Sequence, residues 1–101
     1  EDMEKNELIG PIVSHAGDGN FHVALLIDKK SDEELKKLDD FLIRISERAI
    51  RMDGTCTGEH GVGQGKRKYM LKELGGAVDI MKKVKNAFDP NKIMNPGKLF
   101  L

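Results

Sequence analysis

Two histidines lie on either side of a short turn near the start of the chain, and together they could bind one metal ion. The stretch from His15 to His22 reads His-Ala-Gly-Asp-Gly-Asn-Phe-His. Its Asp18-Gly19 pair tolerates a tight hairpin turn, and the flanking residues have the apolar, alternating pattern of strands. Counting outward from the turn, His15 faces His22, which predicts two imidazoles on one side of a sheet with Cβ atoms roughly 5 Å apart. Histidines beside a turn are also common as ordinary polar surface, and spacing alone leaves both interpretations open.

The third and last histidine belongs to a second cluster, Gly58-Glu59-His60-Gly61-Val62-Gly63, which places a carboxylate beside an imidazole. The only cysteine, Cys56, excludes an internal disulfide and a cysteine-rich zinc site. Histidine and carboxylate are therefore the available metal ligands. The glycines do not form a nucleotide loop, because Gly65-Lys66 is followed by Arg67 where a phosphate loop has Ser or Thr, and a dinucleotide loop requires glycine at position 66.

The elements that must position these clusters follow from apolar spacing. Ser31 and Glu34 form a capping box at the start of a long helix that ends at Asp53-Gly54. Residues 55–57 are β-prone, so they can form a further strand or run along the edge of the sheet. If they return beside the hairpin, they bring Glu59 and His60 to the same end of the sheet as His15 and His22. The stripe expected to pack from the long helix consists of Leu35, Leu38, Leu42, Ile45, Ala49 and Met52, with Phe41 also expected in packing.

Two shorter helices are predicted in the second half, over residues 66–74 and 77–88, with Gly75-Gly76 between them. The tail beyond Asp89-Pro90 cannot continue as helix past Pro96, yet it is apolar enough to be expected to dock on another surface. Residues 1–7 have no apolar period, which predicts a frayed end. The face expected to pack from the helix over 77–88 consists of Ile80, Met81, Val84 and Phe88.

Length and composition limit the classes of protein. A chain of 101 residues forms one domain at most, and a start without methionine close to a strand favours a piece of a longer polypeptide. No apolar run approaches the roughly 20 residues that span a bilayer, and no secretory signal is present. These features predict a soluble protein, with the cytoplasm as its expected location.

The charge is distributed unevenly along the chain. Residues 1–65 hold 8 basic and 14 acidic residues, and residues 66–101 hold 9 and 3, so the halves carry −6 and +6. The basic half fits contact with an anionic cofactor, a substrate or a neighbouring domain, and it also fits a solvated helix face. The chain has no Trp and one Tyr to stack on bases, which argues against nucleic-acid binding.

Three motifs in this order resemble the C-terminal part of the FAD-linked oxidases of the vanillyl-alcohol oxidase type. They are the segment from His15 to His22, the segment from Thr57 to Gly63 with Lys66-Arg67, and the segment from Asp89 to Lys98. The resemblance is closest to the D-lactate dehydrogenase (cytochrome) branch, with glycolate oxidase subunits and D-2-hydroxyglutarate dehydrogenases as relatives. It implies an α+β fold, with a ferredoxin-like antiparallel sheet, helices on one face, C-terminal helices and an irregular tail.

The resemblance also implies residue roles. His15, His22 and Glu59 would bind a divalent metal, zinc or manganese, that holds a small 2-hydroxy acid, and His60 would be the general base. Asn95 would lie near the FAD. Residues 1–101 would form a single partial domain, with the FAD-binding domain absent and the tail over 89–101 docked on it. Relatives that act on a dicarboxylic acid carry Asn at the position of Ala24, so alanine favours D-lactate or glycolate.

This chain alone is then expected to hold no FAD and to be inactive. Two alternatives stay open. One is a non-catalytic metal-binding or interaction module that pairs with a separate flavoprotein, and the other is a plain α+β domain whose histidines have no function. An incomplete sheet would also allow a homodimer through an exposed edge strand.

Overall fold

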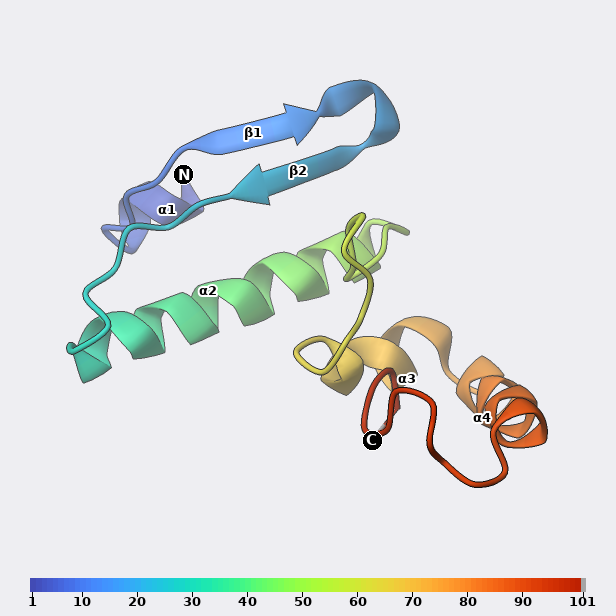
Figure 1. Ribbon diagram of the computed structural model, residues 1–101. Coiled ribbons are helices and arrows are strands. Elements are labelled where there is room, and N and C mark those ends of the chain that lie inside the picture. The colour runs from blue at the N-terminus through green and yellow to red at the C-terminus, as the bar shows by residue number, and fades with distance from the viewer. Residues whose placement is uncertain (101) are drawn as a thin grey trace. The chain divides into compact units, whose positions relative to one another are not determined.

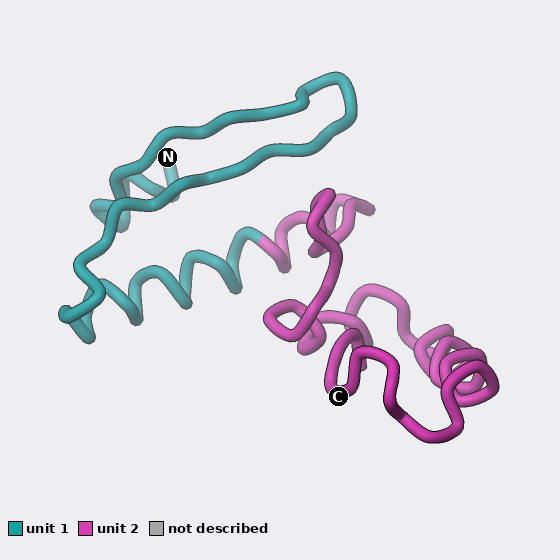
Figure 2. The backbone as a smooth tube through the Cα atoms, viewed as in Figure 1, with its two compact units in different colours: residues 1–45 teal, residues 46–101 magenta. Residues whose placement is uncertain are grey.

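The computed structural model describes residues 1–100 and confirms the α+β class (Figure 1). The chain divides into two compact units, Glu1–Ile45 and a second unit that begins at Ser46 (Figure 2). No helix among residues 1–100 is long and apolar enough to cross a membrane. In chain order the elements are α1 (Asp2–Lys5), β1 (Ile12–His15), the 3-10 turn η1 (Ala16–Asp18), β2 (Asn20–Val23), α2 (Asp32–Arg51), the 3-10 turn η2 (Arg67–Tyr69), α3 (Met70–Leu74) and α4 (Ala77–Phe88).

The hairpin of unit 1 forms where the sequence predicts it, but with a different register. His15 pairs with Asn20, and His22 pairs with Val13, so the two histidines are diagonal neighbours rather than directly opposite. The expected pairing is wrong because Asp18 keeps a negative φ and joins the η1 turn, which leaves only Gly19 in the left-handed region at φ 68°. The pairing moves by two residues in total, and this even shift keeps both histidines on the same face.

The base of the hairpin is closed by backbone contacts. Leu26 N–H donates to the Ile9 carbonyl at 2.8 Å, and Ala24 N–H donates to the Pro11 carbonyl at 3.1 Å. Gly10 lies between these bonds, and a Cβ atom there would stand 2.3 Å from the Ala24 carbonyl oxygen. The two chain segments can approach this closely only because residue 10 has no side chain.

Both ends of α2 follow from the sequence. The Ser31 hydroxyl accepts a hydrogen bond from Glu34 N–H at 3.3 Å, which confirms the N-cap half of the capping box. The Glu34 carboxylate, however, accepts from Asp28 N–H instead of returning to Ser31. At the other end Asp53 takes φ 58°, and Gly54 N–H donates to the Ala49 carbonyl at 2.8 Å, so the helix ends as expected.

The prediction of a frayed end over residues 1–7 is wrong, because residues 2–5 form the one-turn helix α1. Its anchor is long-range: the Arg44 guanidinium on α2 donates to both carboxylate oxygens of Asp2, at 2.8 and 3.1 Å. This hydrogen-bonded pair raises the pKa of Arg44. A bidentate pair of this kind has no signature in the local sequence.

Unit 2 contains no strand at residues 55–57, so of the two alternatives given for this segment the further strand does not form. The segment is instead tied to α3, because the Glu73 carboxylate accepts a hydrogen bond from Cys56 N–H at 2.9 Å. The Cys56 side chain is buried with 4% exposure. Burial, together with the Glu73 carboxylate, raises the pKa of the Cys56 thiol to about 11.

Much apolar surface stays exposed. In unit 1 Phe41 is buried as expected, whereas Met52 in unit 2 is exposed. Helix α4 has the predicted bounds, but its expected packing face is open, with Ile80 at 64% and Phe88 at 81% exposure. Among the described residues of unit 2, from 46 to 100, the buried apolar ones are Cys56, Tyr69, Met70 and Val78.

Candidate functional site

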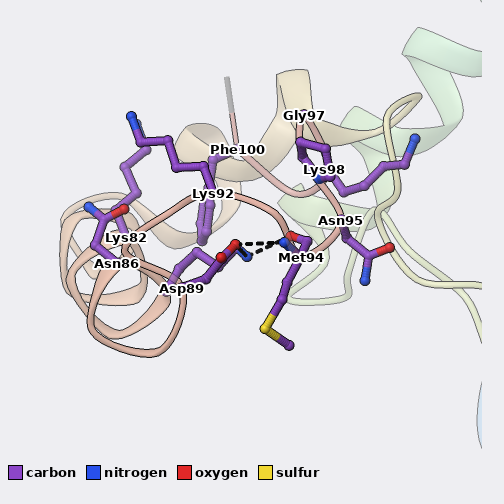
Figure 3. A pocket seen from close by; sticks show the side chains of 11 residues that line it. Lys82, Asn86, Asp89, Lys92, Met94, Asn95, Gly97, Lys98 and Phe100 are labelled. Carbon is purple, nitrogen blue, oxygen red and sulfur yellow. Dashed lines mark hydrogen bonds and ion pairs between the residues drawn. The ribbon is translucent and has the colours of Figure 1, made fainter.

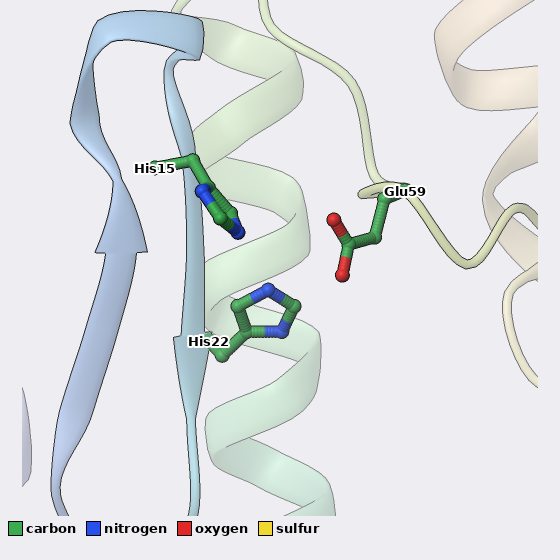
Figure 4. A group of neighbouring side chains, drawn as sticks. All are labelled: His15, His22 and Glu59. Carbon is green, nitrogen blue, oxygen red and sulfur yellow. The ribbon is translucent and has the colours of Figure 1, made fainter.

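The hairpin of unit 1 brings His15 and His22 together. Their ring centroids lie 6.2 Å apart, with the ring planes at 79° (Figure 4). A ring nitrogen of one residue lies within 4.8 Å of a ring nitrogen of the other. His15 is exposed and His22 is half-buried. The sequence therefore predicted the pairing of these two imidazoles on one face, although it placed them in the wrong register.

Two imidazoles at this separation can become ligands of one ion after small side-chain rotations. Zinc binds imidazole nitrogen at about 2.0–2.1 Å, so two such ligands at a tetrahedral angle are about 3.3 Å apart. The rings stand on neighbouring strands, and their Cβ atoms can stay in place while the χ angles adjust. The hairpin is thus a suitable scaffold for half of a metal site.

The loop with the second cluster belongs to unit 2. It turns at Gly58, whose carbonyl accepts from Gly61 N–H at 3.2 Å, and Gly61 and Gly63 take φ values of 75° and 53°. Glu59 and His60 are both exposed, with a carboxylate oxygen of Glu59 3.6 Å from Nε2 of His60. The glycines allow these left-handed conformations at little cost, so that two polar side chains are presented together.

The four predicted residues thus form two pairs. One pair is on the hairpin, and the other is on the loop over residues 58–65, called the glycine loop below. The hairpin belongs to unit 1, and the loop of Glu59, which is also drawn in Figure 4, belongs to unit 2. Convergence of His15, His22 and Glu59 on one ion stays a prediction of the sequence. The donor set fits a metal centre that binds a further ligand, because two neutral imidazoles and a carboxylate leave coordination positions open. Burial of Cys56 at 4% exposure raises the pKa of its thiol to about 11, which disfavours the thiolate that a metal would bind.

Asn95 lines a cavity of about 350 Å³ between α4 and the tail (Figure 3). Its backbone takes φ 45°, an uncommon conformation that asparagine tolerates better than most residues. Four lysines and one aspartate line the same cavity, so its surroundings are basic. The lysines are Lys82, Lys85, Lys92 and Lys98.

The structure also contains functional candidates that the sequence reasoning did not single out. Asp89 is buried with 3% exposure and accepts hydrogen bonds from Lys85 Nζ, from Ile93 N–H and from Met94 N–H. The Lys85 ammonium, helped by the two backbone donors, holds the pKa of Asp89 below its usual value. The sequence did contain a local signal for the Lys85–Asp89 ion pair, because Asp89 follows Lys85 by four residues, about one helical turn.

Comparison with known families identifies the class of protein. Residues 1–99 match the family model of the FAD linked oxidases, C-terminal domain, and the chain therefore belongs to this family. The match confirms the resemblance stated from the motifs. It covers both the hairpin and the glycine loop.

Individual relatives agree with the family. The chain is 52% identical over 101 residues to the mitochondrial D-lactate dehydrogenase [cytochrome] 1 of Saccharomyces cerevisiae, and the match covers 99% of this chain and 17% of that protein. It is 46% identical to a probable mitochondrial D-lactate dehydrogenase of Danio rerio, with 97% and 20% covered. It is also 46% identical over 89 residues to a glycolate oxidase subunit of Bacillus subtilis, with 85% and 18% covered. The chain thus spans about a fifth of the length of these relatives.

Proposed function

We propose that this chain is the substrate- and metal-binding part of a FAD-dependent dehydrogenase that oxidises a small D-2-hydroxy acid to the 2-oxo acid. The observation that carries the proposal is the pair of imidazoles on one face of the hairpin, within a chain of the FAD-linked oxidase family. The names of its relatives, D-lactate dehydrogenase and glycolate oxidase subunit, support D-lactate or glycolate as the substrate class.

We assign His15, His22 and Glu59 as the protein ligands of a divalent zinc or manganese ion. Such an ion supplies a Lewis acid that makes a bound hydroxyl group more acidic. The two imidazoles bind through their neutral form, and Glu59 adds one negative charge, so a carboxylate substrate still meets a net positive centre. Ala24 lies just after β2, and its small, apolar side chain offers no polar partner to a second carboxylate of a larger substrate.

His60 is the general base in this proposal. Its imidazole would accept the proton of the substrate hydroxyl, and the flavin of the parent enzyme, when bound, would supply the acceptor for the hydride from C2. The O–H bonding pair would then form the second bond of the C2 carbonyl, and the C2–H pair would leave with the hydride. Histidine suits this role because its ordinary pKa lies near neutral pH. Nε2 of His60 lies 3.6 Å from a carboxylate oxygen of Glu59, so the proposed base stands beside a proposed metal ligand.

The tail over 89–101 is proposed to dock on the FAD-binding domain, with Asn95 near the cofactor. The open apolar face of α4 and the exposed Ile93 and Met94 in the tail support an interface on this side of unit 2. The lysines around Asn95 suit an anionic neighbour such as a cofactor phosphate. A homodimer through the hairpin edge and a cytoplasmic location stay predictions, and the relatives named above include mitochondrial proteins.

The test is a titration with Zn²⁺ or Mn²⁺ of the wild type and of His15→Ala, His22→Ala and Glu59→Gln, in the presence of the flavoprotein part. Each variant is expected to bind metal at least tenfold more weakly. His60→Ala is the matched control, because it removes a histidine outside the ligand set and should lower turnover while metal affinity is retained. Unchanged affinity in a ligand variant would remove that residue from the site. Tight metal binding without hydroxy-acid oxidation would favour the non-catalytic module.

A further inference from the structure

The C-terminal tail is fastened to α4 at its beginning. The Asp89 carboxylate, at the end of α4, accepts from the backbone N–H of Ile93 at 2.9 Å and from that of Met94 at 3.0 Å. Asp89 and Met94 are drawn in Figure 3. Lys85 adds a second connection, because its ammonium bonds both to Asp89 and to the Met94 carbonyl. The first half of the tail is therefore fixed against the helix rather than left as a loose end.

The other end of the tail is fastened to the glycine loop. Leu99 N–H donates to the Gly63 carbonyl at 2.8 Å. Two residues earlier, the Gly97 carbonyl accepts from the Arg67 guanidinium at 2.9 Å. Arg67 begins the η2 turn directly after the loop, so these two bonds connect the tail to both sides of the Gly65-Lys66 segment. All of these contacts lie within unit 2.

The glycine loop needs such external support. Its four glycines lose more conformational freedom on ordering than other residues would. The turns inside it are closed by long bonds, with Gly61 N–H to the Gly58 carbonyl and Lys66 N–H to the Val62 carbonyl both at 3.2 Å. The bonds to the tail are shorter, and the one from Arg67 is assisted by charge. The orientation of Glu59 and His60 consequently depends on the tail.

We propose that Arg67 is a positioning residue for the loop that carries Glu59 and His60. By holding the Gly97 carbonyl, its guanidinium keeps Leu99 N–H on the Gly63 carbonyl and so limits the motion of the loop. This inference rests on the proposed function for the part that concerns metal binding. The effect of Arg67 on the motion of the loop does not depend on that function.

The experiment compares Arg67→Met and Arg67→Lys with the control Lys83→Met in the protein together with its flavoprotein part. Lys83 is an exposed lysine of α4, so its replacement removes the same charge elsewhere. In Arg67→Met we expect amide hydrogen exchange over residues 58–66 to accelerate roughly tenfold, and Zn²⁺ to bind roughly tenfold more weakly, the lower end of what outer partners of metal ligands contribute. Arg67→Lys keeps one donor and should recover part of both effects, and Lys83→Met should change neither.

Exchange over 58–66 that stays at the wild-type rate in a folded Arg67→Met protein would overturn the inference. If that variant loses its fold, Arg67→Gln, which is too short to reach the Gly97 carbonyl, carries the same expectation. Failure of the proposed function gives a different result. In that case Glu59→Gln binds Zn²⁺ as tightly as the wild type, while the exchange measurement still reports on Arg67.

Discussion

Replacing Gly10 with alanine should open the base of the hairpin that carries both histidines. An added Cβ atom would stand 2.3 Å from the Ala24 carbonyl oxygen and 2.9 Å from its carbonyl carbon. A carbon and an oxygen in ordinary contact are about 3.3 Å apart, so the two segments must separate by about 1 Å. Both obstructing atoms belong to the backbone and cannot move aside as a flexible side chain could.

The expected cost is about 1–3 kcal/mol, the range for forcing an extra methyl group into a closely packed position. The separation would weaken the hydrogen bonds of Ala24 N–H and Leu26 N–H, whose acceptors flank Gly10. At about 1.4 kcal/mol for each factor of ten, these two amides should exchange with solvent about 5- to 150-fold faster. Binding of metal by the hairpin histidines should weaken in parallel.

The assay is hydrogen exchange of the two amides, followed by NMR, with Gly17→Ala as the matched control. A Cβ atom at Gly17 meets nothing within 4 Å, so the control adds the same methyl group to the same hairpin without a clash. Its exchange rates should match those of the wild type. Equal rates in Gly10→Ala and Gly17→Ala would refute the account of the hairpin base.

Three further perturbations test unit 2. Burial alone would raise the pKa of Glu73, but the hydrogen bonds to its carboxylate outweigh burial and lower the pKa. These bonds therefore stabilise the fold above about pH 4.5, and the stabilisation is lost as the pH falls below that value. Glu73→Gln should abolish this pH dependence of stability in an acid titration followed by circular dichroism. The Cys56 thiol, with a pKa of about 11, should react with iodoacetamide at about pH 8 only after unfolding, and rapid labelling of the folded protein would contradict this. Asp89→Asn should accelerate amide exchange at Ile93 and Met94, and unchanged rates there would show that the carboxylate does not hold the tail.

Local signals specified the helices well. Ser31 caps α2, Asp53-Gly54 ends it, and Gly75-Gly76 and Asp89-Pro90 bracket α4, because caps and breakers act through their nearest backbone neighbours. The segment over 66–74 was also recognised, although its first turn is a 3-10 turn. Such features need no knowledge of the rest of the molecule.

The errors arose where a choice depended on distant residues or on fine backbone geometry. The register of the hairpin depended on whether Asp18 would adopt a positive φ, and it does not. Residues 55–57 were β-prone, but the Glu73 carboxylate holds this segment in a loop. The apolar face of α4 was recognised correctly as apolar, yet periodicity cannot specify what covers a face, and Ile80 and Phe88 are exposed.

For the candidate site, the sequence predicted the two pairs of residues, and the structure describes the geometry within each. His15 and His22 share one face despite the register error, since an even shift preserves the side of the sheet. Arg67, which joins the tail to the segment after the loop, was missed as a functional candidate because its partner is the Gly97 carbonyl, and a backbone acceptor leaves no pattern of side chains.

The central claim is that His15, His22 and Glu59 bind one ion together, and X-ray absorption spectroscopy of the zinc-loaded protein tests it most directly. Two imidazole nitrogens at about 2.0–2.1 Å and a carboxylate oxygen at about 2.0–2.2 Å are expected in the wild type. Glu59→Gln should lose the carboxylate contribution while both imidazoles stay bound. A zinc spectrum that is identical in the wild type and in Glu59→Gln would contradict the account.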